Sequence, residues 1–170
     1  EDSLISSIAC CIELIKSGVT TFLESGGQYV DAMVEAVDKT GIRACLAKSV
    51  MDNGEGLPEA WDKTCEEELN TQIELFEKYN NACDERVKIW FGLRTIFNNS
   101  DELIVKTKKL ADKYNTGIHM HIAEIADEID FAKTRKGFGT VEHLNELGVL
   151  GPNLLAVHTV WLNNRELDLF

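Results

Sequence analysis

The chain has 170 residues, 44% of them hydrophobic, which predicts one globular domain with a core that needs no disulfide cross-links. Its 17 Lys and Arg residues stand against 29 Asp and Glu residues, so the formal net charge is −12. This balance argues against a nucleic-acid partner, because affinity for phosphates comes mainly from clustered Lys and Arg. The sequence contains no run of the roughly 18 to 20 apolar residues that a membrane-spanning helix needs, so we expect a soluble chain without a membrane partner.

The cysteines and the two ends of the sequence bear on where the protein works. There are five cysteines, an odd number, and none has the C-x-x-C spacing of a zinc or redox motif. Free thiols in a reducing compartment are the simplest interpretation, and no basic-plus-apolar secretory signal opens the chain, so we expect a cytoplasmic protein. The sequence starts at Glu1 without a Met and ends at Phe170, and we expect it to be an excerpt of a longer protein.

Short β-branched runs alternate with longer amphipathic stretches along the whole chain. In chain order the pattern predicts a helix over 4–17, a strand over 19–24, a helix over 29–39, a strand over 42–47, a turn-rich loop over 53–58, a helix over 59–79, a strand over 87–92, a helix over 100–114, a strand over 116–122, a helix over 138–147, a strand over 154–157 and a further helix from Asn163. Gly18 is placed to end the first helix, and Ser100 is placed to cap a later one.

The alternation gives about five strand-then-helix units without a hairpin signal, which indicates parallel strands joined by right-handed crossovers. An open doubly wound sheet and part of a (β/α)8 barrel both fit this order. No G-x-G-x-x-G follows a strand, which removes the main support for a dinucleotide-binding sheet. Because a complete barrel takes about 250 residues, we predict an α/β fold in which residues 1–170 form one incomplete TIM-type barrel domain.

Polar residues that could carry chemistry follow the predicted strands, where both architectures place their sites. The sharpest cluster is Gly117-Ile-His-Met-His-Ile-Ala-Glu124, in which His119 and His121 share one strand face and Glu124 lies just past the strand. Imidazole is a common zinc ligand, and a nearby carboxylate can move the proton of an activated water. Two histidines on one strand face also occur as polar core or surface residues, but His158, at the end of the next strand, favours a site.

These motifs resemble a known family. The stretch Gly117-Ile-His-Met-His-Ile-Ala-Glu124, followed after a helix by Leu154-Leu-Ala-Val-His-Thr-Val-Trp161, is similar to the amidohydrolase superfamily. More narrowly, it resembles the group of 5'-methylthioadenosine/S-adenosylhomocysteine deaminases, chlorohydrolases and guanine deaminases. Residues 13–22 and 41–47 are similar to the same group, and the resemblance follows the chain order over nearly all 170 residues.

The resemblance implies barrel strands two to six and a role for each candidate residue. His121 would bind the metal at the end of strand five, Glu124 would be the general acid/base, and His158 would orient the water or the substrate. Arg94 and His119 would lie beside the substrate, although a solvated arginine at the barrel rim is an equal interpretation of Arg94. The implied enzyme is a zinc-dependent hydrolase of C–N bonds other than peptide bonds, with Fe2+ as the alternative metal. The implied reaction is hydrolytic deamination of an aminopurine nucleoside.

Departures from the family pattern leave other functions open. The family's H-x-H pair on strand one and its Asp on strand eight are absent, so the 170-residue chain by itself is predicted to be inactive. A triazine-type chlorohydrolase or aminohydrolase, a guanine deaminase and a truncated non-catalytic derivative are the alternatives. The open strand edges of a partial barrel also predict a homo-oligomer.

Three features are interpreted as structural. Lys48 is expected to be a surface lysine, and Trp161 is expected to be a packing residue. The charge run over 127–130 is expected to be the solvated face of a helix.

Overall fold

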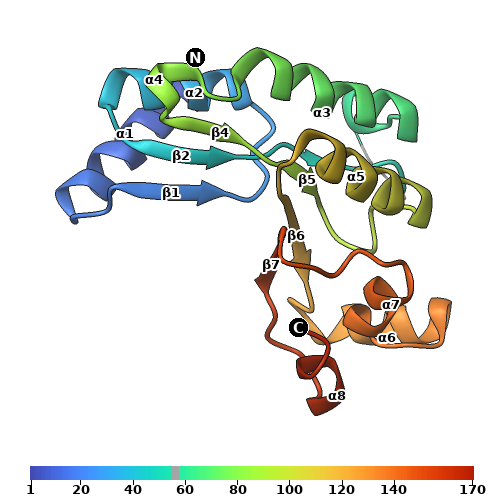
Figure 1. Ribbon diagram of the computed structural model, residues 1–170. Helices are drawn as coiled ribbons and strands as arrows, with labels where there is room; N and C mark the ends of the chain where they lie inside the picture. Colours follow the sequence, from blue (N-terminus) through green and yellow to red (C-terminus); the bar gives the residue numbers. More distant parts are fainter. Residues whose placement is uncertain (55–57) are drawn as a thin grey trace.

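A computed structural model describes residues 1–54 and 58–170, so the middle of the predicted turn-rich loop, residues 55–57, lies outside the described residues. Every paired strand is parallel to its neighbour (Figure 1). The pairing orders are β1-β2-β4 and β3-β5-β6-β7. The strands are β1 (Thr21–Glu24), β2 (Arg43–Leu46), β3 (Ser49–Val50), β4 (Val87–Ile89), β5 (Phe91–Leu93), β6 (Ile118–Ile122) and β7 (Leu154–His158).

The two sheets form one continuous arc, because two strands of the first sheet each resume in the second sheet after a short interruption. β2 resumes as β3 after Ala47 and Lys48, and β4 resumes as β5 after Trp90. At this crossing a Cβ atom on Gly92 would overlap the backbone oxygen of Lys48, so the two chains approach more closely than other residues allow. Parallel strands that follow one another in chain order, each separated by helical crossovers, confirm the predicted part of a (β/α)8 barrel.

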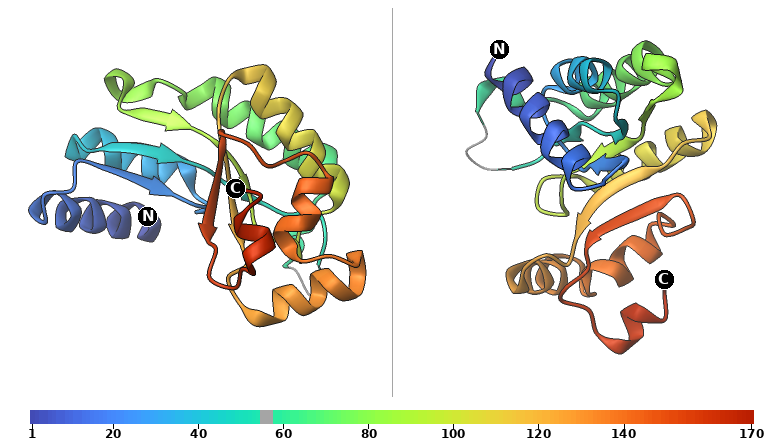
Figure 2. Two further views of the ribbon diagram at one scale, coloured as in Figure 1. Left: turned by 60° about the horizontal axis from the view of Figure 1, so that its bottom comes forward. Right: turned by 90° about the vertical axis from the view of Figure 1, so that its left-hand side faces the viewer.

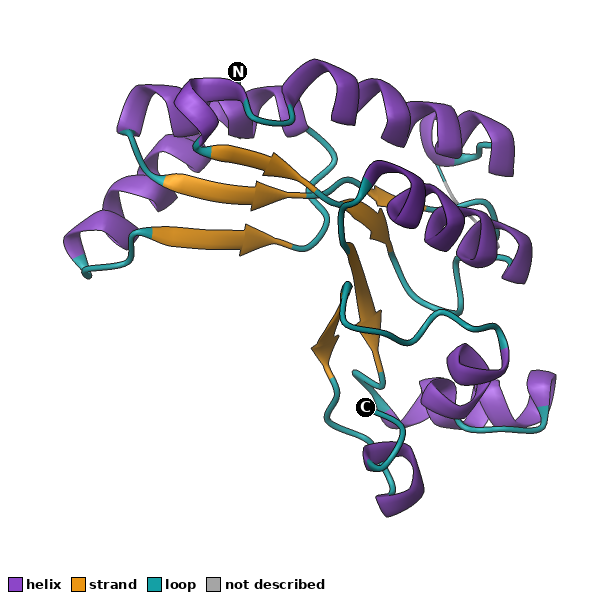
Figure 3. Ribbon diagram, viewed as in Figure 1, coloured by secondary structure: helices purple, strands orange, loops and turns teal. Residues whose placement is uncertain are grey.

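Most of the helices lie along the outer side of this arc, whereas α8 (Asn164–Leu167) lies beyond the carboxyl ends of β6 and β7, as Figures 2 and 3 show. The other helices are α1 (Asp2–Lys16), α2 (Val30–Thr40), the 3-10 helix η1 (Glu59–Trp61), α3 (Cys65–Tyr79), α4 (Ala82–Glu85), α5 (Asp101–Tyr114), α6 (Ala126–Lys136) and α7 (Thr140–Glu146). The helix predicted from residue 59 begins instead at Cys65, because the Thr64 hydroxyl accepts a hydrogen bond from the Glu67 amide and caps it there. Ser100 caps α5 as predicted, through a hydrogen bond from the amide of Leu103.

The core has two parts, both between the strands and the helices. One surrounds β5 and β6, where Phe91 and Met120 are fully buried against α5 and α7. The other surrounds β2 and β4, where Leu46 and Val87 pack against α2. Burying this outer face of the arc fixes the strands, and the carboxyl ends of β6 and β7 are thereby held side by side. None of the helices in the described ranges is long and apolar enough to cross a membrane.

Candidate functional site

Three of the predicted residues meet at the carboxyl ends of β6 and β7. The rings of His121 and His158 stack with their centres 5.5 Å apart and an angle of 29° between their planes. The Nε2 atom of His158 lies 3.5 Å from Oε1 of Glu124, and both side chains remain partly exposed, 36% and 45% respectively. The parallel register that pairs Ile122 with His158 brings these side chains to one mouth of the arc.

The ring of His121 is oriented by the main chain of the preceding barrel strand. Its Nδ1 atom lies 2.9 Å from the backbone oxygen of Arg94, and its own backbone amide donates to the same oxygen at 3.0 Å. A carbonyl oxygen only accepts hydrogen bonds, so the Nδ1 atom carries the proton and the Nε2 atom keeps its lone pair. That is the form in which an imidazole binds a divalent metal ion.

Arg94 therefore contributes its backbone oxygen to the cluster, whereas its side chain is exposed. His119 shares the inward face with His121 but is completely buried, two residues earlier on β6. Its Nε2 atom lies 3.7 Å from the Cys45 sulfur, and the Trp90 ring meets it edge-on at 5.0 Å. Burial lowers the pKa of His119 to about 4, so its ring is neutral near pH 7. The substrate-binding roles of Arg94 and His119 stay predictions.

Three residues at this mouth have strained backbone conformations. Ala123, His158 and Thr159 have φ angles of 52°, 75° and 51°, a left-handed region that non-glycine residues rarely adopt. The two strand ends are tied together there, because the amide of Thr159 donates to Ile122 at 2.9 Å and the amide of Val160 donates to Ala123 at 3.1 Å. Strain that the surroundings hold in place is typical of active sites.

One further residue at the mouth was not predicted as part of the site, because the charge run over 127–130 was expected to be the solvated face of a helix. That interpretation is wrong for Glu128, which is only 1% exposed. Its carboxylate accepts hydrogen bonds from the backbone amides of Ala123 at 2.9 Å and Glu124 at 3.1 Å. Burial raises the pKa of this carboxyl group. The only signal in the sequence is its place four residues after Glu124, at the start of a helix.

Two other expectations are also wrong. Lys48 is not a surface lysine: its side chain is 13% exposed and its ammonium lies 3.6 Å from the carboxylate of Glu68, whose side chain is 4% exposed. Trp161 is 53% exposed among the described residues, so it is not buried by packing in this chain. Within the described part of the chain, neither Lys48 nor Trp161 forms an ion pair or a ring contact with the cluster of His121, Glu124 and His158.

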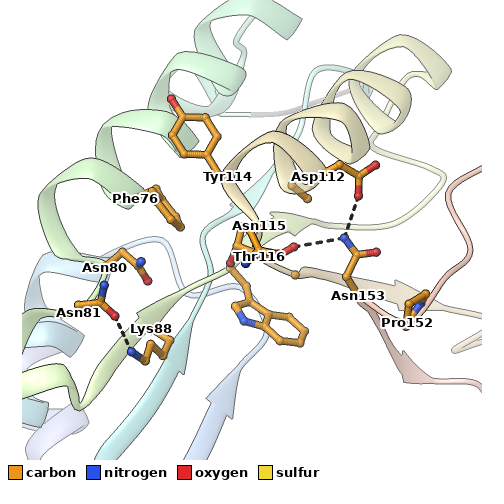
Figure 4. Close-up of a pocket in the computed structure, with 13 residues that line it drawn as sticks. Phe76, Asn80, Asn81, Lys88, Asp112, Tyr114, Asn115, Thr116, Pro152 and Asn153 are labelled. Atoms are coloured by element: carbon orange, nitrogen blue, oxygen red, sulfur yellow. Dashed lines mark hydrogen bonds between the residues drawn. The ribbon is translucent and has the colours of Figure 1, made fainter.

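A pocket of about 520 Å³ lies at the opposite, amino-terminal ends of β4, β6 and β7 (Figure 4). Trp90, Lys88 and Asn153 are among its lining residues, and the ammonium of Lys88 donates to the side-chain oxygen of Asn81. None of the candidate residues predicted from the sequence lines it. Because barrel enzymes place their chemistry at the carboxyl ends of the strands, the candidate site is the cluster of His121, Glu124 and His158.

The cluster fits part of a metal site. The free Nε2 atom of His121 is a suitable ligand, and Glu124 and His158 can serve as acid–base and hydrogen-bonding groups. A catalytic zinc site takes three protein ligands as a rule. Within residues 1–54 and 58–170, no group of three or more His, Cys, Asp or Glu side chains is placed to hold a metal ion. Among the described residues, the cluster therefore contains one suitable metal ligand with two ionisable side chains beside it.

Comparison with known proteins identifies relatives that match nearly the whole of this chain. A 5'-deoxyadenosine deaminase of Methanobrevibacter smithii is 37% identical over 165 residues, which cover 97% of this chain and 36% of the relative. A 5-methylthioadenosine/S-adenosylhomocysteine deaminase of Pelotomaculum thermopropionicum is 32% identical over 99% of this chain and 37% of the relative. The crystal structure of an adenosine deaminase from Xanthomonas campestris with bound zinc superposes with a TM-score of 0.85 at 23% identity, over 98% of this chain and 36% of that one.

The chain thus spans little more than a third of the length of these relatives. The adenosine deaminase structure confirms the fold, since the superposition covers nearly the whole chain. The profile of the amidohydrolase family matches residues 6–170. Both the family profile and the curated relatives agree with the resemblance carried by the stretch from Gly117 to Glu124, and the chain belongs to the amidohydrolase family.

Proposed function

We propose that this chain is part of a metal-dependent amidohydrolase that deaminates an aminopurine nucleoside modified at its 5' position. The single observation that carries the proposal is the contact of His121, Glu124 and His158 at the carboxyl ends of β6 and β7. The names of the relatives, 5'-deoxyadenosine deaminase and 5-methylthioadenosine/S-adenosylhomocysteine deaminase, support this substrate class. They favour loss of ammonia over loss of chloride, the reaction of the triazine alternative.

His121 would hold the metal through Nε2, because Arg94 occupies the other ring nitrogen. Zinc is the expected ion and Fe2+ the alternative, and the zinc in the adenosine deaminase structure supports this choice. When bound, such an ion supplies Lewis-acid activation of the attacking water.

Glu124 would transfer the protons of the reaction, and His158 would assist it by hydrogen bonding. Water adds to the ring carbon that bears the amino group, the carbon–nitrogen bond breaks, and ammonia leaves. The Glu124 carboxylate takes a proton from the water and delivers it to the ring nitrogen beside the reacting carbon. It then carries the proton of the added hydroxyl group to the amino group, which leaves as ammonia, and its partial exposure leaves it open to a substrate. His158, 3.5 Å from this carboxylate, holds its orientation and donates a hydrogen bond to the water or the substrate.

The wider setting of the protein follows from composition and fold. All five cysteines are free thiols, which supports a cytoplasmic location, and the net charge of −12 argues against a nucleic-acid partner. β1 and β7 end their sheets with unpaired backbone edges among the described residues, and we propose that such edges pair with further strands or with a second copy. The 170-residue chain by itself is expected to be inactive, since it supplies too few metal ligands.

The test uses the longest natural reading frame that contains this chain, loaded with Zn2+. Ammonia release is measured with 5'-deoxyadenosine, methylthioadenosine, S-adenosylhomocysteine, guanine and atrazine. We expect activity on the 5'-modified adenosines, and Glu124→Gln should lower kcat by about 100-fold or more, because general acid–base catalysis contributes about that much. Glu146→Gln, at an exposed position on α7, is the matched control. Turnover of guanine or atrazine alone would contradict the proposed substrate, and an unchanged kcat in Glu124→Gln would contradict the proposed role.

A further inference from the structure

Helices in this molecule repeatedly use a Glu at their third position in the same way. Its carboxylate reaches back and accepts a hydrogen bond from the backbone amide of the residue that caps the helix, which satisfies an amide left free at the helix start. The pairs that do this are Glu67 with Thr64 in α3, Glu142 with Gly139 in α7, and Glu166 with Asn163 in α8, at 2.8, 3.0 and 3.1 Å.

α6 departs from this pattern. Glu128 holds the same third position, since the helix begins at Ala126 and its cap is Ile125. The carboxylate nevertheless passes Ile125 and binds the amides of Ala123 and Glu124 instead, one oxygen to each. Its hydrogen bonds therefore stabilise the connection between β6 and α6, which carries Glu124, in place of the cap.

The peptide that Glu128 binds is also held from its other side. Ala123 is completely buried in the left-handed conformation, with φ at 52°. Its backbone oxygen accepts hydrogen bonds from Val160 at 3.1 Å and Trp161 at 3.0 Å, in the segment that follows His158. A non-glycine residue keeps this conformation only where its surroundings impose it. The carboxylate of Glu128 on one side and the segment after β7 on the other supply that restraint.

We propose that Glu128 is a positioning residue of the candidate site: by fixing the backbone amides of Ala123 and Glu124, it aims the Glu124 carboxylate at His158. The catalytic consequence rests on the proposed function, whereas the structural consequence does not. Without Glu128 the connection after β6 loses two charge-assisted hydrogen bonds, and the 3.5 Å approach of Glu124 to His158 is no longer enforced.

The first experiment measures hydrogen exchange of backbone amides in the longest natural reading frame that contains this chain. In Glu128→Gln we expect the amides of Ala123 and Glu124 to exchange about 10-fold faster, because a neutral amide side chain supplies only one acceptor oxygen for two donors. Glu166→Gln is the matched control, since Glu166 is also 1% exposed and also holds two helix starts, accepting from Asn163 and from Val141. There the amides of Val141 and Asn163 should accelerate, while those of Ala123 and Glu124 should not.

Unchanged exchange at Ala123 and Glu124 in Glu128→Gln would overturn the proposal. If that variant exchanges faster everywhere because it does not fold, Glu128→Asp decides the question. The shorter side chain keeps the charge but cannot span both amides, so local acceleration at Ala123 and Glu124 is expected, and its absence overturns the proposal.

The second experiment measures steady-state kinetics on the substrate that the wild-type protein deaminates. In Glu128→Gln we expect kcat to fall about 10-fold while KM stays within about 2-fold, because the acid–base group is displaced and the substrate contacts are kept. Glu166→Gln should lower the melting temperature without changing kcat. Equal losses in kcat for both variants would show a general structural role and overturn the proposal. A wild-type protein without deaminase activity would contradict the proposed function alone, since the exchange experiment would still test Glu128.

Discussion

The Nδ1 atom of His121 lies 2.9 Å from the backbone oxygen of Arg94, across the parallel pair formed by β5 and β6. Since that oxygen can only accept a hydrogen bond, the contact selects the tautomer of His121 whose Nε2 atom is free. The metal-binding form of the ring is thus set by main-chain geometry. Replacing the side chain of residue 94 leaves the oxygen in place.

Metal content should therefore depend on His121 and not on the side chain of Arg94. In the longest natural reading frame that contains this chain, His121→Ala should lower zinc affinity by at least about 100-fold, since loss of a ligand costs more than loss of an outer partner. Arg94→Ala should keep its zinc, because the backbone oxygen still holds the ring. Zinc bound per protein after dialysis against graded chelator measures both. Equal loss of zinc in the two variants would contradict this account of the site.

His119 should make the stability of the chain depend on pH. Burial depresses its pKa from 6.5 to about 4 in the folded chain, so the unfolded chain takes up the proton first as the pH falls. The contribution of the neutral His119 ring to the free energy of unfolding is therefore complete above pH 6.5. This contribution decreases by about 3 kcal/mol in total as the pH falls to about 4. His119→Gln should remove this part of the decrease, as followed by urea denaturation between these pH values. The same dependence in both proteins would show that His119 is not its source.

The buried pair of Lys48 and Glu68 should be sensitive to the loss of either partner alone. Lys48→Met leaves the Glu68 carboxylate, only 4% exposed in its side chain, without its cation, and we expect the free energy of unfolding to fall by about 3 kcal/mol. The double variant Lys48→Met/Glu68→Leu should recover most of that loss, because no buried charge remains.

Chemical denaturation of the single and double variants measures this coupling. Lys39→Met is the control, since the pair of Lys39 with Glu35 is about half exposed, and its loss should change stability by no more than about 0.5 kcal/mol. If the double variant loses as much free energy of unfolding as Lys48→Met alone, the result would contradict a stabilising ion pair between Lys48 and Glu68.

Gly92 should tolerate no side chain. A Cβ atom there would overlap the Lys48 backbone oxygen, so Gly92→Ala should lower the free energy of unfolding by about 3 kcal/mol. Gly41→Ala is the comparison: Gly41 caps α2 in the left-handed region with φ at 78°, but no atom lies within 4 Å of an added Cβ. That change should cost only about 1 kcal/mol from backbone strain. Melting curves of the two variants measure the difference, and equal losses would contradict the close approach at Gly92.

Much of the architecture was readable in the local pattern of residues. Apolar periodicity, the helix stop at Gly18 and the helix start at Ser100 predicted the alternation of strands and helices, because helix and strand periods are properties of short segments. The shared face of His119 and His121 followed from the two-residue period of a strand. The gathering of His121, Glu124 and His158 at one end followed from the parallel order of the strands.

Only the tertiary structure decided how these segments meet. The interruption at Trp90, the close approach at Gly92 and the ion pair of Lys48 with Glu68 depend on the register between neighbouring strands and on the helix packed over them. The buried role of Glu128 depends on where the chain turns after β6, since its local sequence is that of a solvated helix start. The sequence by itself determined the alternation of strands and helices and the shared face of His119 and His121. Contacts between elements distant in the chain decided which charged side chains are buried away from solvent, because burial is a property of the packed molecule.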